Sequence, residues 1–173
     1  MRLDGDGWRN FFDSYRRDAF RLETLPSYDV AGERDEYNAF HATGELFIPP
    51  DDPWLTRVRR FRESGRWIGR VHIVTRPLSD YLRYEFAVYR HTVDAGEDVR
   101  ILDVTDRPDP GLPDQDFWLF DEAAVVRMDY DAQGRQLGRE LLEDVDVAPY
   151  VAWKHLALEL SVPFREYEAT CRA

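Results

Sequence analysis

The chain has 173 residues, of which 43% are hydrophobic, and its 34 acidic and 23 basic residues give it a formal net charge of −11. This length is typical of one domain, and this apolar fraction excludes a wholly disordered chain. No apolar run is long enough to cross a bilayer, and residues 1–8 lack the apolar stretch of a signal peptide. The lone cysteine, Cys171, excludes an intrachain disulfide and a cysteine-built zinc site. We therefore expect a single-domain cytoplasmic protein that does not enter membranes.

The basic residues are almost all of one type. Lys154 is the only lysine, and every other basic residue is an arginine. Codon usage in a GC-rich genome explains this bias most simply. The alternative is that the arginines make planar, bidentate contacts to carboxylates or phosphates. Because the chain as a whole is acidic, it repels phosphate backbones, and direct nucleic-acid binding is not expected.

The first 65 residues predict a helical lobe. Aromatic residues recur at largely helical spacing over 8–22, so we expect one helix there, ended by Pro26. A second helix is expected over 33–42, where Gly44 follows as a stop signal. A third is expected over 54–64, whose apolar stripe is flanked by arginines.

Strands dominate the rest of the chain. The expected elements are a strand over 67–75, a helix over 80–95 capped by Ser79, a strand over 98–104, a hairpin of 117–120 with 123–130, a strand near 136–142, and one or two helices over 146–167 interrupted at Pro163. A β-α-β unit followed by antiparallel strands and a closing helix predicts a mixed sheet with helices packed against it. We therefore expect an α/β (α+β) core over residues 66–173, joined to the helical lobe in one domain.

Sequence motifs for catalysis or cofactor binding are not found. The expected strand-to-helix junction at 75–79 has no glycine, so it does not predict a loop that cradles phosphate. No HExxH, GxSxG or DxDxDG pattern occurs. We therefore expect no metal and no cofactor, and we interpret Cys171 as an incidental thiol.

One group of polar residues is a candidate ligand-binding site. His72 is the only histidine on an expected inner strand, and Arg70 lies two residues before it, on the same face of the sheet. Side chains from the following helix could lie near the mouth of that face. The candidate set is Arg70, His72, Arg83, Tyr84 and Glu85, which suits an anionic or polar ligand. The alternative is that Arg70 and His72 face solvent while Arg83 and Glu85 pair on the helix surface.

Five aspartates lie close together around the expected hairpin, at positions 114, 116, 121, 129 and 131. Carboxylates this close in sequence can hold a divalent cation, but their spacing matches no calcium loop. Turns also select aspartate for local hydrogen bonding. We favour the turn interpretation.

Several segments resemble one uncharacterised family, DUF6879, found mostly in actinobacteria. They are RVHIVTRPLSDYLRYE (70–85), AGEDVRIL (95–102) and PDQDFWLFD (113–121), with further similarity at FRLETL (20–25), at VVRMDYDAQGRQLGRELLED (125–144) and around 150–153. Membership of this family implies no established activity. The resemblance implies that the gene lies near genes for helix-turn-helix regulators, and hence that the protein has a regulatory or partner-binding role.

The order of elements from 70 to 160 is also similar to a phospholipase D-like half-domain. If Asp121 stands for the aspartate of that family's HxKxxxxD motif, then Asp114 and Asp116 occupy the histidine and lysine positions. Phosphodiester transfer needs a nucleophilic imidazole and a cation, and aspartate supplies neither. The resemblance therefore implies a catalytically inactive version that could sense a ligand or a partner.

Three functions follow from these patterns. The first, which the sequence favours, is a non-catalytic regulatory protein that binds a protein partner such as a helix-turn-helix regulator. The second is a small enzyme or ligand sensor, in which His72 would act as general acid or base and the arginines would hold an anion. The third is nucleic-acid binding through arginines 57, 59, 60, 62, 66 and 70, with Trp54 and Trp67 available for stacking. The oligomeric state is left open.

Overall fold

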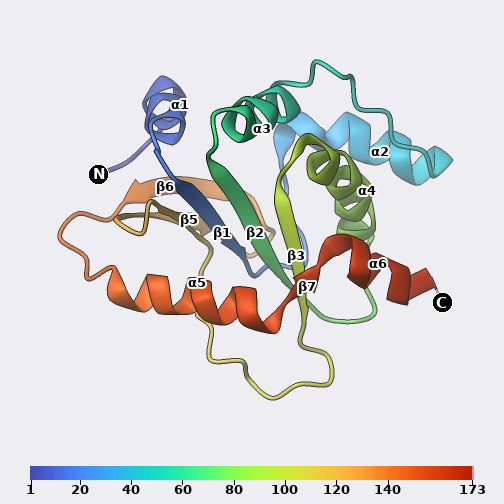
Figure 1. Ribbon diagram of the computed structural model, residues 1–173. Helices are drawn as coiled ribbons and strands as arrows, with labels where there is room; N and C mark the ends of the chain where they lie inside the picture. Colours follow the sequence, from blue (N-terminus) through green and yellow to red (C-terminus); the bar gives the residue numbers. More distant parts are fainter. Residues whose placement is uncertain (173) are drawn as a thin grey trace.

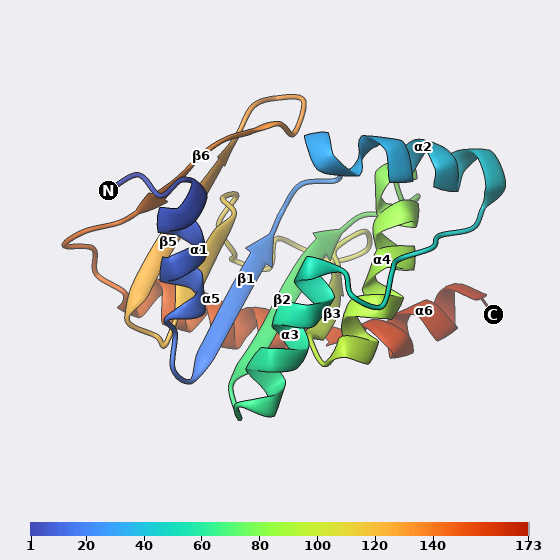
Figure 2. The ribbon, with the colours of Figure 1, turned by 90° about the horizontal axis from the view of Figure 1, so that it is seen from above.

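The computed structural model describes residues 1–172, which form one mixed β-sheet with helices on both of its faces (Figures 1 and 2). The strands are β1 (Asp18–Glu23), β2 (Trp67–Val74), β3 (Asp98–Asp103), β4 (Phe117–Phe120), β5 (Ala124–Tyr130), β6 (Gln136–Leu141) and β7 (Val162–Pro163). The helices are α1 (Gly5–Asp13), the 3-10 turn η1 (Ala31–Glu33), α2 (Arg34–Thr43), α3 (Pro53–Glu63), α4 (Asp80–Ala95), α5 (Ala148–Leu160) and α6 (Phe164–Arg172). Across residues 1–172, no helix combines the length with the apolar character that a membrane crossing needs.

The strand order is β6-β5-β4-β1-β2-β3-β7. β1, β2 and β3 run parallel, and the remaining strands pair antiparallel to their neighbours. The expected α/β class and the expected elements after residue 66 are confirmed, except for the short edge strand β7, which was not expected. The cap of α4 is also confirmed, since the Leu82 amide donates to Ser79 Oγ at 3.1 Å. The likeness to phospholipase D stays a prediction from the order of elements.

The helix expected over 8–22 is wrong beyond Asp13. Residues Asp18–Glu23 form β1, which lies inside the sheet between β2 and β4 (Figure 1). The sequence DAFRLE alternates with a period of two, so Phe20 and Leu22 face α5 while Arg21 and Glu23 face the other way. The aromatic spacing in this segment fits a helix as well as a strand, and pairing with β2 decides between them. The segment expected to be wholly helical therefore supplies a central strand.

Each face of the sheet has its own apolar core. Under α5, the core contains Phe20, Leu22, Val71, Phe117 and Leu119. On the opposite face, α1 and α3 cover a second core that contains Phe12, Phe61, Ile68, Trp118 and Phe120. Figure 2 shows α1 and α3 lying over this face, with α5 beneath the sheet. Burying each of these large side chains contributes roughly 1.5–3 kcal/mol to folding.

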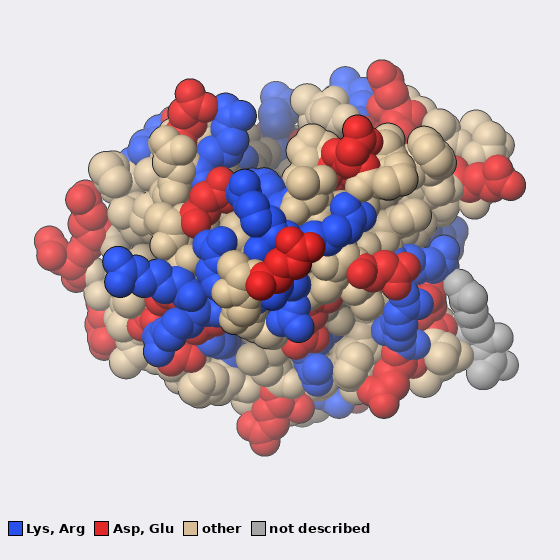
Figure 3. All heavy atoms as spheres, turned by 45° about the horizontal axis from the view of Figure 1, so that its top comes forward, with Lys and Arg blue, Asp and Glu red and all other residues tan. Residues whose placement is uncertain are grey.

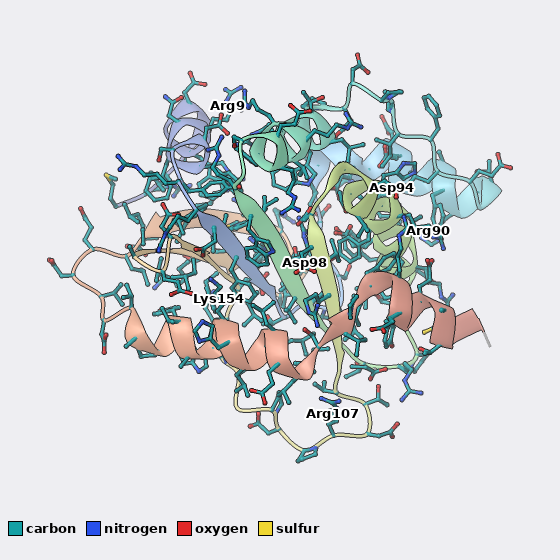
Figure 4. All side chains as sticks on the ribbon, in the orientation of Figure 1. Arg9, Arg90, Asp94, Asp98, Arg107 and Lys154 are labelled. Carbon is teal, nitrogen blue, oxygen red and sulfur yellow. The ribbon has the colours of Figure 1, made fainter. Side chains whose placement is uncertain are left out.

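The only lysine attaches α5 to the sheet. Lys154 points from α5 toward the strands (Figure 4), and its Nζ lies 2.8 Å from both Asp18 Oδ1 and Glu122 Oε1. The ammonium also lies 5.6 Å from the centre of the Trp67 ring. Because Lys154 is buried and has two carboxylate partners, its charge is compensated where it enters the core.

The turn between β5 and β6 packs tightly on the segment that follows β1. The Asp29 amide donates to the Gly134 carbonyl at 2.9 Å. Gly134 has a φ of +80°, and a Cβ at this position would lie 2.3 Å from the Ser27 carbonyl oxygen. Both the backbone conformation and this close approach therefore require glycine.

We expect Gly134→Ala to lower the free energy of unfolding by about 2–4 kcal/mol, because left-handed strain and a clash with backbone add together. The matched control is Gly65→Ala, since Gly65 has a φ of +77° but no atom within 4 Å of an added Cβ. The control should lose only about 1 kcal/mol. Urea unfolding of both variants measures the difference, and equal losses would show that the contact with Ser27 does not constrain the fold.

Candidate functional site

Two neighbouring strands carry ionisable side chains on the face that α1 and α3 cover. In the register of β1 with β2, Arg21 is opposite Arg70 and Glu23 is opposite His72. Because in-register strands lie about 4.8 Å apart, these four side chains form one compact group. His72 is fully buried, and Arg21 and Glu23 expose only 5% and 6% of their surface. The interpretation that Arg70 and His72 face solvent is therefore wrong.

Carboxylates that precede two other strands complete the group. Glu97 lies just before β3, and Arg70 Nε donates to its Oε1 at 2.5 Å while Arg70 Nη1 donates to Glu23 Oε1 at 3.1 Å. Asp116 lies just before β4, and its Oδ2 accepts from Arg21 Nη2 at 3.0 Å. Each buried arginine therefore has a carboxylate partner at hydrogen-bonding distance. Here we call the three carboxylates, the two arginines and His72 the ion cluster.

Hydrogen-bond counting gives the protonation state of His72. Its Nε2 lies 2.9 Å from the Leu25 carbonyl oxygen, which can only accept, so Nε2 carries a proton. Tyr89 donates its single hydroxyl proton to Glu23 Oε2 at 2.9 Å, so the 2.8 Å contact from His72 Nδ1 to the Tyr89 oxygen needs a second ring proton. The ring is therefore an imidazolium, with Glu23 Oε2 3.4 Å from its Nδ1.

The ion cluster is electrically balanced. Arg21, Arg70 and His72 carry positive charge, and they face the carboxylates of Glu23, Glu97 and Asp116. Burial opposes ionisation of Glu23, but Arg70, His72 and Arg21 outweigh it and lower the pKa of Glu23 to about 2. Such a cluster is tolerated in a core only when each charge is paired and hydrogen-bonded.

A cavity of about 310 Å³ lies over the ion cluster. Sheet residues line it from below, α4 lines one side, and α1, α3 and β6 complete the wall. The lining includes Arg21, Glu23, Arg70, Trp118 and Tyr130 from the sheet, Glu85 and Tyr89 from α4, Trp54 and Arg57 from α3, Trp8 and Phe12 from α1, Arg139 from β6, and Glu33 from η1. The cavity therefore combines aromatic walls with charged groups of both signs, as small-molecule sites do.

Two carboxyl groups at the α4 side of the cavity have no cation beside them. Among residues 1–172, no lysine or arginine side chain lies within ion-pair distance of Glu33 or Glu85. Burial raises the pKa of Glu85 to about 8, and the charges of Glu23 and Glu33 add to the effect. Burial also raises the pKa of Glu33. Glu85 is therefore mostly neutral near neutral pH.

The structure separates the five residues of the candidate set. Arg70 and Glu85 line the cavity, and His72 lies beneath it as part of the ion cluster. Tyr84 is buried and donates to Glu36 Oε1 of α2 at 2.5 Å, so it joins α4 to α2. The Arg83 side chain is 61% exposed and pairs with Asp80 at 3.3 Å, outside the cavity.

Four residues of the ion cluster were not in the candidate set. Arg21 and Glu23 lie in the segment expected to be helical, and Glu97 and Asp116 lie in loops. The available signal was the two-residue alternation of DAFRLE, which places two charged residues among three apolar ones on a strand. No local sequence pattern identifies Glu97 or Asp116 as members of the cluster, because only the strand order brings them next to β1 and β2.

The aspartates around the hairpin serve different local purposes. Asp121 accepts hydrogen bonds from the amides of residues 16, 17 and 18, and Asp131 accepts from the amides of residues 133 and 135. Asp116 is buried in the ion cluster and also accepts from Thr24 and Tyr28. Within residues 1–172, no group of acidic, histidine or cysteine side chains is arranged to hold a metal ion.

Most of the arginines proposed for nucleic-acid binding are engaged with the protein itself. Arg57 and Arg60 pair with Asp13, and Arg66 donates to the carbonyl oxygens of Asp13 and Tyr15. Arg70 belongs to the ion cluster, with 11% of its side chain exposed. Figure 3 shows basic side chains near the centre of this side of the molecule, with acidic side chains among them. This face therefore lacks the uninterrupted basic stripe that phosphate backbones favour.

Comparison with known sequences identifies one family. The model of the family described as Domain of unknown function (DUF6879) matches residues 6–169. No curated protein matches the chain. The matched range contains every residue of the ion cluster.

The hydrogen-bond count at His72 predicts that both ring nitrogens carry protons in the folded protein. Nitrogen–proton correlation spectra of protein labelled in its histidines should show two ring N–H groups for this residue. In Tyr89→Phe, the Nδ1 proton loses its acceptor and its signal should move or disappear, while the Nε2 proton stays bonded to Leu25. An unprotonated ring nitrogen in the unmodified protein would contradict the count.

The raised pKa of Glu85 predicts a stability cost at high pH. An unfolded glutamate ionises near 4.5, whereas folded Glu85 holds its proton until about pH 8, so the free energy of unfolding falls as pH rises through this window. Glu85→Gln cannot ionise, so it should be more stable than the unmodified protein at pH 8 by on the order of 4 kcal/mol, with little difference below pH 4.5. Urea unfolding across this range tests it, with the exposed Glu63→Gln as control. Parallel pH profiles for the unmodified protein and Glu85→Gln would contradict the prediction.

Proposed function

The chain belongs to the DUF6879 family, and we propose that it is a non-catalytic regulatory protein that binds a small polar molecule in the cavity over β1 and β2. The observation that carries this proposal is the convergence of buried charged side chains on a cavity with aromatic walls. Binding cavities for small molecules start at about 300 Å³ and combine apolar walls with a few placed polar groups. The cavity of about 310 Å³ meets both conditions.

The position of His72 supports binding rather than catalysis. A general acid or base must reach the proton it transfers. Both nitrogens of His72 are occupied by protein partners, and the side chain has no exposed surface. Tyr89, which is hydrogen-bonded to His72, and Glu23, 3.4 Å from its Nδ1, line the cavity, whereas His72 does not. The residue that the sequence offered as an acid or base is thus better suited to fixing Glu23 and Tyr89 in place.

A regulatory role adds a protein partner to this proposal. We propose that ligand binding is transmitted to a helix-turn-helix regulator in the cytoplasm. This part of the proposal is supported only by the family resemblance and by the neighbouring regulator genes that the resemblance implies. Co-purification from native cells with and without the ligand tests it.

Ligand binding itself is tested with a library of small polar compounds. A compound that occupies the cavity at 100 times its Kd should stabilise the protein by about 2.7 kcal/mol, seen as a raised melting temperature. Val88→Trp fills the cavity from α4 and should remove the effect. Arg83→Trp places the same side chain on the exposed side of α4 and should leave it intact.

Three outcomes would overturn the proposal. The library stabilises neither the unmodified protein nor Arg83→Trp; a compound binds equally well to Val88→Trp; or a bound compound is chemically converted by the purified protein. The first two remove the cavity as a binding site, and the third replaces binding with catalysis.

A further inference from the structure

The ion cluster leaves one cation of the cavity without a carboxylate partner. Arg139 of β6 lines the cavity, with its guanidinium 5.1 Å from the centre of the Trp8 ring. Its one hydrogen bond among residues 1–172 runs from Nη2 to Gln136 Oε1 at 3.2 Å, and its buried Nε has no partner. Arg21 Nε, from another lining residue, is also buried without a hydrogen bond, and the Glu23 carboxylate lies 3.7 Å from it, beyond hydrogen-bonding distance. These two unused donors point to a missing anion.

A second imbalance of opposite sign lies at the other side of the cavity. Glu33 and Glu85 both line it, and they share one hydroxyl group, that of Tyr81. A hydroxyl group has a single proton, so it satisfies only one of the two carboxyl groups at a time. Without a ligand, the proton that Glu85 keeps accommodates the second acidic group, so a bound cation would take the place of that proton.

The strand order keeps the two imbalances apart. Arg139 starts from β6, three strands from β1, and burial together with the charge of nearby Arg21 lowers its pKa, so the two guanidinium groups lie on the same side of the cavity. Glu85 starts from α4, which packs over β2 and β3 on the opposite side of β1. Aromatic rings, including those of Trp54 and Trp118, also line the cavity. The cavity therefore has an arginine without a carboxylate partner on its β6 side and two acidic groups on its α4 side.

We propose that the ligand is a zwitterion, with a carboxylate or phosphate held by Arg139 and Arg21 and an amino or guanidino group held by Glu85 and Glu33. This inference rests on the proposed function and specifies its ligand class. A purely anionic ligand would leave the acidic end unpaired, and a purely cationic one would leave the arginine donors unpaired. A zwitterion completes both ends at once.

Proton release distinguishes pairing with Glu85 from a merely structural role. The groups that face Glu85 are Glu23 of β1, Arg70 of β2, Glu33 of η1 and Tyr81 of α4 itself, and burial with these neighbours raises its pKa to about 8. Glu85 must therefore lose its proton near neutral pH to pair with an ammonium group. Calorimetry in two buffers with different heats of ionisation should find close to one proton released per bound amine.

The probes are ω-amino acids of increasing length, namely glycine, β-alanine, γ-aminobutyrate and ε-aminocaproate. Caproate, which has only the carboxylate, and hexylamine, which has only the ammonium group, are the single-charge controls. Calorimetric titration of the full chain should show that the best zwitterion binds at least ~10-fold more tightly than caproate or hexylamine. Arg139→Gln should weaken the zwitterion about 10-fold without affecting hexylamine, and Arg139→Lys should restore part of the loss. Glu85→Gln should weaken the zwitterion without affecting caproate, and should abolish proton release. Arg83→Gln, outside the cavity, is the matched control.

Each result decides for or against the inference. If the library finds a cavity ligand but the zwitterions bind no better than their single-charge parts, the zwitterion inference is wrong while the proposed function stands. If zwitterions bind but Arg139→Gln and Glu85→Gln weaken all probes equally, then the Arg139 side does not bind the anionic group and the Glu85 side does not bind the cationic group. The inference is again wrong in that case. If no compound in either set binds, the proposed function is itself wrong.

Discussion

Glu23 lies inside a seven-stranded sheet with 6% of its surface exposed, and its negative charge must be compensated there. It accepts hydrogen bonds from Arg70 and Tyr89 and lies beside the His72 imidazolium. Each of those partners then needs a partner of its own, which brings in Glu97 and the Leu25 carbonyl. The arrangement of β1, β2 and α4 on this face follows from satisfying one buried carboxylate.

The elements after residue 66 could be predicted from sequence because local signals agree with tertiary context there. Ser79 caps α4, Gly96 ends it, and the alternation in β2 matches its two buried faces. β1 could not be predicted in the same way. Its aromatic residues fit helical and strand periods equally, and the choice is made by hydrogen bonds to β2 and β4, which are distant in sequence.

The candidate site was predicted only where its residues share an element. Arg70 and His72 were found because they alternate on one strand, and Glu85 was included because the helix that follows this strand could bring it near the same face. Arg83 was included for its nearness in sequence, but two positions along a helix separate it from the face of Glu85. The remaining partners come from chain segments that only the folded sheet brings together, and no local pattern encodes that proximity.

The ion cluster has a cost that its contribution to stability does not explain. A buried ion pair is often no more stabilising than apolar residues of similar volume. The same face of the sheet already carries a packed aromatic core, in which Phe12 contacts both Phe61 and Trp118, so apolar side chains would fit this environment. Apolar residues in place of the ion cluster would not position charged groups beneath the cavity. Because the cluster is balanced within itself, Arg139 and Glu85 above it have no ion-pair partner in the cluster, which is why the proposed ligand is assigned to them.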